Sequence, residues 1–113
     1  MKIIITGGAG FIGSHLAEYL CSIKKIKKIV VLDNLEDGSK KNLKEALKSK
    51  KVLLFKADIR NYKKIVNYFK NTSAVIHLAA LSDIVPSIEE PREYLETNFN
   101  GTLNILEAMK KYK

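Results

Sequence analysis

The sequence predicts a single α/β domain in which about four parallel strands form a doubly wound sheet with helices on both faces. Two observations predict this class. Short runs rich in isoleucine, valine and leucine, typical of buried parallel strands, recur at residues 1–6, 28–33, 52–58 and 73–80. A segment with helical periodicity lies in each interval between these runs. Because crossovers between parallel strands are right-handed, this order of elements predicts the spatial strand order 3-2-1-4.

A glycine-rich loop joins the first strand to the first predicted helix, and its three motif glycines are Gly7, Gly10 and Gly13. In a dinucleotide-binding turn, the first glycine permits the tight turn and the second lets a pyrophosphate approach the backbone. The third lets the helix pack closely on the sheet. The N–H groups of Phe11 and Ile12, at the helix start, would then face the phosphates. For the glycines alone, a tight turn that binds nothing is the alternative.

An acidic residue at the end of the second strand supports dinucleotide binding. Asp33 follows Gly13 by twenty residues. A carboxylate at this distance can accept hydrogen bonds from both hydroxyls of an adenosine ribose, and its charge disfavours a 2′-phosphate. The sequence therefore predicts a partial Rossmann-type domain that prefers NAD to NADP. A carboxylate that only caps a loop is the alternative.

Each predicted helix between the strands carries one apolar face. The first is expected over residues 11–23, with a core face of Ile12, Leu16, Tyr19, Leu20 and Ile23. Ser39 is expected to cap the second, which runs to about residue 49 with Leu43, Ala46 and Leu47 inward. The third is expected over residues 62–70, and its inward side chains are Ile65, Val66 and Phe69.

The last predicted element is a helix that begins near Pro91, a residue suited to the first helical turn, and runs to residue 113. Its apolar stripe consists of Leu95, Phe99, Leu103, Leu106 and Met109. Gly101 costs about 1 kcal/mol relative to alanine inside a helix, so we expect close packing on the sheet there. The preceding residues 81–90 are expected to form a loop or a loop with a short helix.

Composition restricts the classes of function. The 113 residues fit one domain, and the net charge of +8 comes almost entirely from lysine. Because the lysines are scattered without an aromatic stripe, a solvated basic surface is favoured over a nucleic-acid site. No apolar run reaches the roughly 18 residues of a membrane span, and no signal peptide is visible, so we expect a cytoplasmic protein. The single Cys21 and the isolated His15 and His77 predict no metal site.

Five segments together resemble the extended short-chain dehydrogenase/reductase family, whose members include nucleotide-sugar epimerases and dehydratases. The segments are Thr6–Leu16, Asp33–Leu35 with Gly38, Ala57–Arg60, His77–Ala80 and Asn98–Ala108. They occur in the family's order and span the whole chain. Among the branches of the family, the UDP-glucose 4-epimerases are the most similar.

The resemblance implies that the chain binds NAD and assigns residues to its adenosine end. It places Asp33, with the backbone of Asn34 and Leu35, at the adenosine ribose. It places the Asp58 carboxylate at the adenine amino group and the Ile59 N–H at the adenine ring. For Asp58, a helix cap is the alternative.

The resemblance also implies residues at the nicotinamide end of the cofactor. Leu78, Ala79 and Ala80 are small or apolar, so the nicotinamide ribose can lie close to them. Asn98 is expected to bridge loop backbone near this end, although an asparagine in isolation is more often a helix-surface residue. These residues complete the predicted cofactor site.

The chain departs from the family's catalytic pattern. That pattern needs a tyrosine with a lysine four residues later, which lowers the tyrosine's pKa so that it can act as a base. None of the five tyrosines has such a lysine. At the position of Ser82, many 4-epimerases of the family that the chain resembles carry a lysine instead. We therefore predict no catalytic residue. Residues 1–113 would form an NAD-binding domain that stops before the catalytic segment, and a missing C-terminal part would bind the nucleotide sugar.

Two further expectations follow. A non-catalytic dinucleotide-binding module or regulatory subunit is the alternative function. The strand order leaves the fourth strand at an edge, where Ala74, Val75 and Ile76 are apolar. Because exposed apolar edges invite pairing, we expect a homo-oligomer or association through this strand.

Overall fold

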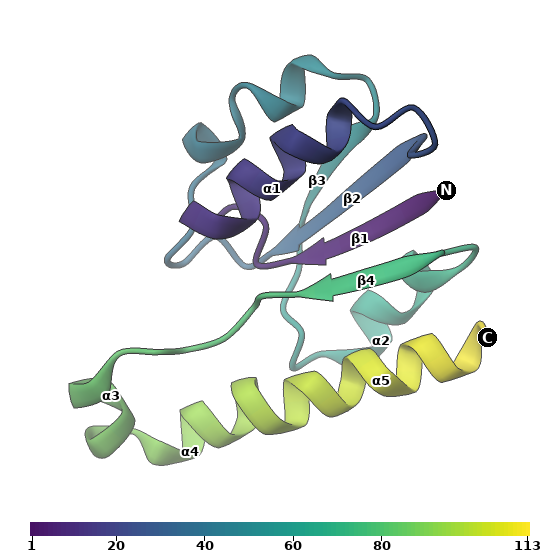
Figure 1. Cartoon of the computed structure of the whole chain (residues 1–113). Helices are drawn as coiled ribbons and strands as arrows, with labels where there is room; N and C mark the ends of the chain where they lie inside the picture. Colours follow the sequence, from purple (N-terminus) through teal and green to yellow (C-terminus); the bar gives the residue numbers. More distant parts are fainter.

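A computed structural model describes residues 1–113 and confirms the predicted class (Figure 1). Its four strands are β1 (Lys2–Thr6), β2 (Lys28–Asp33), β3 (Val52–Lys56) and β4 (Ala74–His77). All three strand pairs are parallel, and the spatial order is β3-β2-β1-β4, as predicted. The strand order reverses between β1 and β4, so the carboxyl ends of these two strands mark the switch point of the sheet.

The sheet is buried on both faces. Ile3 and Ile5 of β1 belong to a core beneath α1 (Phe11–Cys21), whereas Ile4 belongs to a second core beneath α2 (Tyr62–Ile65) and α5 (Gly101–Lys111). Successive strand residues point to opposite faces, so an uninterrupted apolar run supplies both cores. Figure 1 shows the corresponding two layers of helices on either side of the strands.

The predicted core face of α1 is wrong in part. The helix ends at Cys21, and its buried residues are Gly13, Ser14, Ala17 and Leu20. Ile12 and Tyr19 are 69% and 66% exposed. Small side chains form the contact because they let the helix backbone approach the sheet closely, which displaces the larger apolar side chains to the outer surface.

The two other connections are shorter and tighter than predicted. Lys40–Leu43 and Ala46–Lys48 are separate 3₁₀ turns, where one helix was expected. α2 likewise continues as a 3₁₀ turn over Val66–Phe69. Ser39 caps the first of these turns as expected, since its hydroxyl accepts a hydrogen bond from the Lys41 N–H at 3.2 Å. Because short segments tied to strands at both ends favour the 3₁₀ geometry, the inward side chains were predictable but the helix type was not.

After β4 the chain forms α3 (Ile84–Glu89), α4 (Pro91–Tyr94), a π-helical stretch Leu95–Asn100, and α5. Figure 1 shows α4 and α5 as one long rod, with α3 beyond the end of the sheet. None of these helices combines the length and apolarity that crossing a membrane would require.

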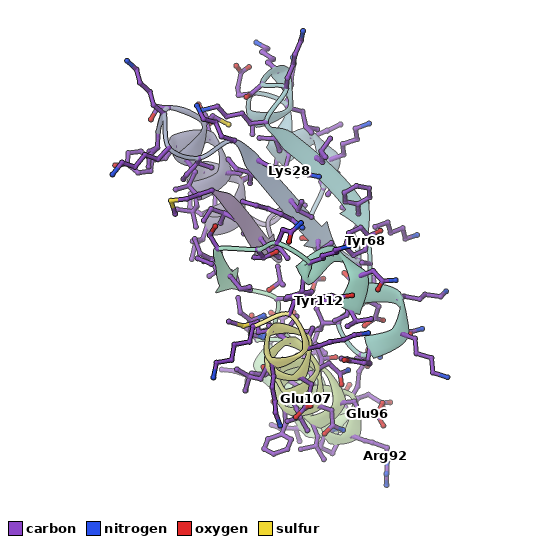
Figure 2. All side chains as sticks on the ribbon, turned by 90° about the vertical axis from the view of Figure 1, so that its right-hand side faces the viewer. Lys28, Tyr68, Arg92, Glu96, Glu107 and Tyr112 are labelled. Carbon is purple, nitrogen blue, oxygen red and sulfur yellow. The ribbon has the colours of Figure 1, made fainter.

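The long rod does not bury its predicted apolar stripe. The residues that it buries are Gly101, Ile105 and Ala108. The five residues of the predicted stripe are between 41% and 65% exposed. Close packing at Gly101 is confirmed, but the partner is Ile59, whose Cδ1 would lie 2.6 Å from a Cβ at position 101. Figure 2 shows Arg92, Glu96 and Glu107 on the outer side of the rod.

Candidate functional site

A groove lies at the carboxyl ends of the strands, where parallel α/β sheets bind ligands. It encloses about 650 Å³, including space open to solvent. Nine of the fourteen predicted site residues line it: Gly7, Gly10, Asp33, Asn34, Asp58, Ile59, Leu78, Ala79 and Ala80. The other five are not among its lining residues: Phe11, Ile12, Gly13, Leu35 and Asn98. All four strand ends therefore contribute to one concave surface.

The three motif glycines of the loop, Gly7, Gly10 and Gly13, occupy different environments. Gly7 has a φ of +69°, and a Cβ there would lie 2.7 Å from the Ala79 nitrogen. A Cβ on Gly13 would lie 2.6 Å from the carbonyl oxygen of Gly7. Gly10 is the exception, because the nearest atom to its Cβ position is the same oxygen at 3.4 Å. Gly7 and Gly13 are thus required by the fold, whereas Gly10 presents bare backbone to the groove.

The start of α1 adds hydrogen-bond donors to this surface. The side chains of Phe11 and Ile12 are exposed, so these residues contribute backbone only. The first N–H groups of a helix have no partner within it, and they carry the positive end of the helix dipole. An anionic group near Gly10 would find donors there.

Asp33 ties the end of β2 to the glycine loop. It is only 7% exposed. Its Oδ2 accepts a hydrogen bond from the Ala9 N–H at 2.9 Å, and its Oδ1 accepts one from the Leu35 N–H at 2.8 Å. Each carboxylate oxygen can accept a second hydrogen bond. The predicted alternative, a loop cap, is therefore part of what Asp33 does, and acceptor capacity remains for a ligand.

The segment that follows β2, from which Gly38 contributed to the family resemblance, completes the loop's support. The Ala9 carbonyl accepts hydrogen bonds from the Ser39 N–H at 3.1 Å and the Asn42 Nδ2 at 2.8 Å. A Cβ on Gly38 would lie 2.9 Å from the Ala9 carbonyl carbon, so the two segments are in close contact. Asp37, Gly38, Leu81 and Thr97 also line the groove but were not predicted. Among these four residues, only Gly38 belonged to a segment that carried the family resemblance.

Asp58 is engaged by a neighbour. The Arg60 Nη2 donates to its Oδ2 at 2.6 Å, and the Arg60 Nε lies 3.0 Å from both carboxylate oxygens. These hydrogen bonds from Arg60 lower the pKa of the Asp58 carboxyl, which is therefore charged at neutral pH. The alternative prediction, that Asp58 caps the following helix, is wrong, because α2 begins after Asn61 without a side-chain cap.

Residues Leu78–Leu81, which follow β4, form one wall of the groove, and this wall is bonded to the long rod. The Leu81 N–H donates to the Asn98 Oδ1 at 2.8 Å, and the Asn98 Nδ2 donates to the Leu81 carbonyl at 2.8 Å. Asn98 thus bridges loop backbone, in the geometry expected from the sequence. The bridge uses one acceptor site and one N–H of the amide, and through it Asn98 positions Leu81, which lines the groove.

Comparisons with known proteins extend these observations. The family model described as GDP-mannose 4,6 dehydratase matches residues 4–113. The chain is 43% identical to the dTDP-D-glucose 4,6-dehydratase of Dictyostelium discoideum, over 99% of this chain and 26% of that protein. It is 37% identical to a UDP-glucose 4-epimerase of Schizosaccharomyces pombe, over 97% of this chain and 32% of that protein.

A solved structure shows the same arrangement of elements. The dTDP-glucose 4,6-dehydratase of Streptomyces venezuelae, with NAD and TYD bound, superposes with a TM-score of 0.84 and 30% identity. The match covers 96% of this chain and 35% of that chain. The chain therefore spans about a quarter to a third of the length of these relatives.

Proposed function

The chain belongs to the GDP-mannose 4,6 dehydratase family, and from this membership we propose that it is the NAD-binding part of a nucleotide-sugar epimerase or dehydratase. The observation that carries the proposal is the pairing of Gly10, which presents open backbone, with the buried Asp33 carboxylate in one groove. The open backbone at Gly10 suits the negatively charged pyrophosphate of a dinucleotide, and the Asp33 carboxylate suits its uncharged ribose hydroxyls. The phosphates need donors and room, and the ribose needs an acceptor.

The residues present fit the cofactor along its length. We assign the pyrophosphate to Gly10 and the start of α1, and the adenosine ribose to Asp33. We assign the adenine to the segment at Asp58, and the nicotinamide ribose to Leu78, Ala79 and Ala80 of the Leu78–Leu81 wall. NAD supplies the hydride acceptor in this class of reaction. The chain's own residues bind and orient the cofactor, and the negative charge of Asp33 favours NAD over NADP.

We propose no proton-transfer step for these residues. No tyrosine of the chain is followed by a lysine at the fourth position. A second candidate is a dinucleotide-binding module without catalysis of its own. The second candidate predicts reversible binding of both NAD and NADH without a nucleotide sugar, whereas the first predicts a nucleotide sugar as the partner of the complete enzyme.

Titration with NAD tests the proposal, and Gly10→Ala sharpens the test. A methyl group at this position meets no protein atom closer than 3.4 Å, so the melting temperature should stay within a few degrees. The same methyl group enters the space assigned to the pyrophosphate. Overpacking of about 1–3 kcal/mol corresponds to a loss of NAD affinity of roughly ten- to hundredfold. Isothermal titration calorimetry measures the affinity.

The control for this experiment is Asn100→Ala, on an exposed part of the rod away from the groove. Its NAD affinity should equal that of the unchanged protein. Absence of NAD binding by the unchanged protein would contradict the proposed function. Equal binding by Gly10→Ala would contradict the placement of the pyrophosphate.

We also propose that the chain associates through the β4 edge. β4 pairs with β1 alone, so its other side is open, and Ala74 is exposed. Apolar edges of this kind pair with other strands. Sedimentation velocity over a range of protein concentrations should show a species larger than the monomer. A monomeric profile at every concentration would contradict this expectation.

A further inference from the structure

The Leu78–Leu81 wall is held at one end by hydrogen bonds to Thr6 and at the other by hydrogen bonds to Asn98, and His77 lies between these two anchors. Thr6, at the end of β1, is fully buried. Its hydroxyl oxygen accepts hydrogen bonds from the Ala79 N–H at 3.2 Å and from the Leu78 N–H at 3.1 Å, and the Leu78 N–H also donates to the Thr6 backbone carbonyl at 3.0 Å. At the other end of the wall, Asn98 of the rod holds Leu81. His77 lies between these anchors and contacts both elements.

The direction of each hydrogen bond around His77 can be derived. A threonine hydroxyl has two acceptor lone pairs and one hydrogen. Both lone pairs of Thr6 are used by backbone N–H groups, so its hydrogen must point to His77 Nδ1, which is 2.6 Å away. Nδ1 is then the acceptor and carries no hydrogen. The hydrogen of the neutral ring is on Nε2, which lies 2.9 Å from the Thr102 hydroxyl oxygen.

The chain of hydrogen bonds continues into the rod. The Thr102 hydroxyl donates to the Asn98 carbonyl at 2.6 Å. Each group in the chain therefore donates to the next, from the amides of the wall, through Thr6, His77 and Thr102, to the backbone carbonyl of Asn98. A charged His77 would present a hydrogen at Nδ1 to an oxygen whose lone pairs are already filled. Burial lowers the pKa of His77, and no charged side chain contributes to that shift.

We propose that His77, as the neutral ring with its hydrogen on Nε2, is a positioning residue that sets where the Leu78–Leu81 wall stands against the glycine loop. The position matters because Gly7 and Ala79 are in direct contact, so a displaced wall changes the groove. This inference rests on the proposed function in so far as the groove binds NAD. The hydrogen-bond chain itself stands without a ligand.

The first test needs no cofactor. Two-bond ¹H–¹⁵N correlation spectra of the protein at pH 7 should show His77 with an unprotonated Nδ1 and a protonated Nε2. A hydrogen on Nδ1, or a charged ring, would overturn the inference. In His77→Phe, which keeps a ring but no polar atom, hydrogen exchange at the Ala79 amide, which donates to the Thr6 hydroxyl, should accelerate at least tenfold. Unchanged exchange in a folded His77→Phe protein would also overturn it.

A second set of measurements separates positioning from general stability. NAD affinity of the unchanged protein should fall on acidification, because a charged ring breaks the chain; since burial lowers the pKa of His77, the fall should come at a pH lower than the 6.5 of an ordinary histidine. His77→Asn places an acceptor near Thr6 that does not titrate, so it should keep affinity within about threefold and lose this pH dependence. Identical pH profiles for the two proteins would overturn the role of His77.

If His77→Phe does not fold, Thr102→Val tests the same hydrogen-bond chain on the Nε2 side of His77. It removes the acceptor of the Nε2 hydrogen and leaves the contact between Thr6 and His77 in place. Exchange at the Ala79 amide should again accelerate, and an unchanged rate would overturn the inference. Because spectra and exchange are read without NAD, failure of the protein to bind NAD would contradict the proposed function alone.

Discussion

Replacing Gly7 with alanine is expected to lower the free energy of unfolding by about 2–5 kcal/mol. Two effects add. The φ of +69° is a left-handed conformation, which costs a residue with a Cβ roughly 1–2 kcal/mol. The new methyl carbon would also lie 2.7 Å from the Ala79 nitrogen, a backbone atom that cannot rotate away, and overpacking of this kind costs about 1–3 kcal/mol.

Thermal and urea unfolding measure this loss. For a domain of about 100 residues, each kcal/mol shifts the melting temperature by roughly 4–8 °C, so the shift is large enough to resolve. Gly10→Ala is the matched control, because it adds the same methyl group to the same loop with no contact closer than 3.4 Å. Equal stabilities for the two variants would show that the close approach between β1 and the wall after β4 is not a constraint on this fold.

The second large effect is expected for Asp33→Ala. The substitution removes both carboxylate oxygens that accept the Ala9 and Leu35 N–H groups. Hydrogen bonds to a charged acceptor contribute about 1.5–3 kcal/mol, and the Ala9 N–H is left buried without a partner. We therefore expect the free energy of unfolding to fall by roughly 2–4 kcal/mol and NAD affinity to fall by a few kcal/mol at most.

Asp33→Asn distinguishes the two roles. The amide keeps one acceptor oxygen and nearly the same shape, so part of the stability should return. It lacks the negative charge that disfavours a 2′-phosphate, so the preference for NAD over NADP should narrow. Calorimetric titration with both cofactors, beside urea unfolding, gives the two quantities separately. A preference unchanged in Asp33→Asn would refute the assignment of Asp33 to the ribose.

Much of the fold was predictable from local pattern. The apolar runs predicted all four strands, because a buried parallel strand needs apolar side chains on both faces. The glycine spacing predicted the turn, because the left-handed Gly7 and the crowded Gly13 leave no room for a side chain. Asp33 was also predictable, because it is a carboxylate that ends a buried strand twenty residues after Gly13.

Helix faces were less predictable. Periodicity marks where large apolar side chains recur, but it does not show which face approaches the sheet. In α1 and in the rod the contact is made by small residues, such as Ala17 and Gly101, because they allow the shortest distance between backbones. The large side chains of the same helices, including Tyr19 and Phe99, are left at the surface.

The sequence by itself determined the strands, their order, the glycine loop and the acidic residue that closes β2. Only the tertiary structure decided what holds that loop and the wall opposite it. Asn42 reaches Ala9 from 33 residues away, and His77 lies 71 residues from Thr6 and 25 from Thr102. Contacts between residues so far apart in the chain leave no spacing pattern, because they depend on where the sheet and the helices finally stand.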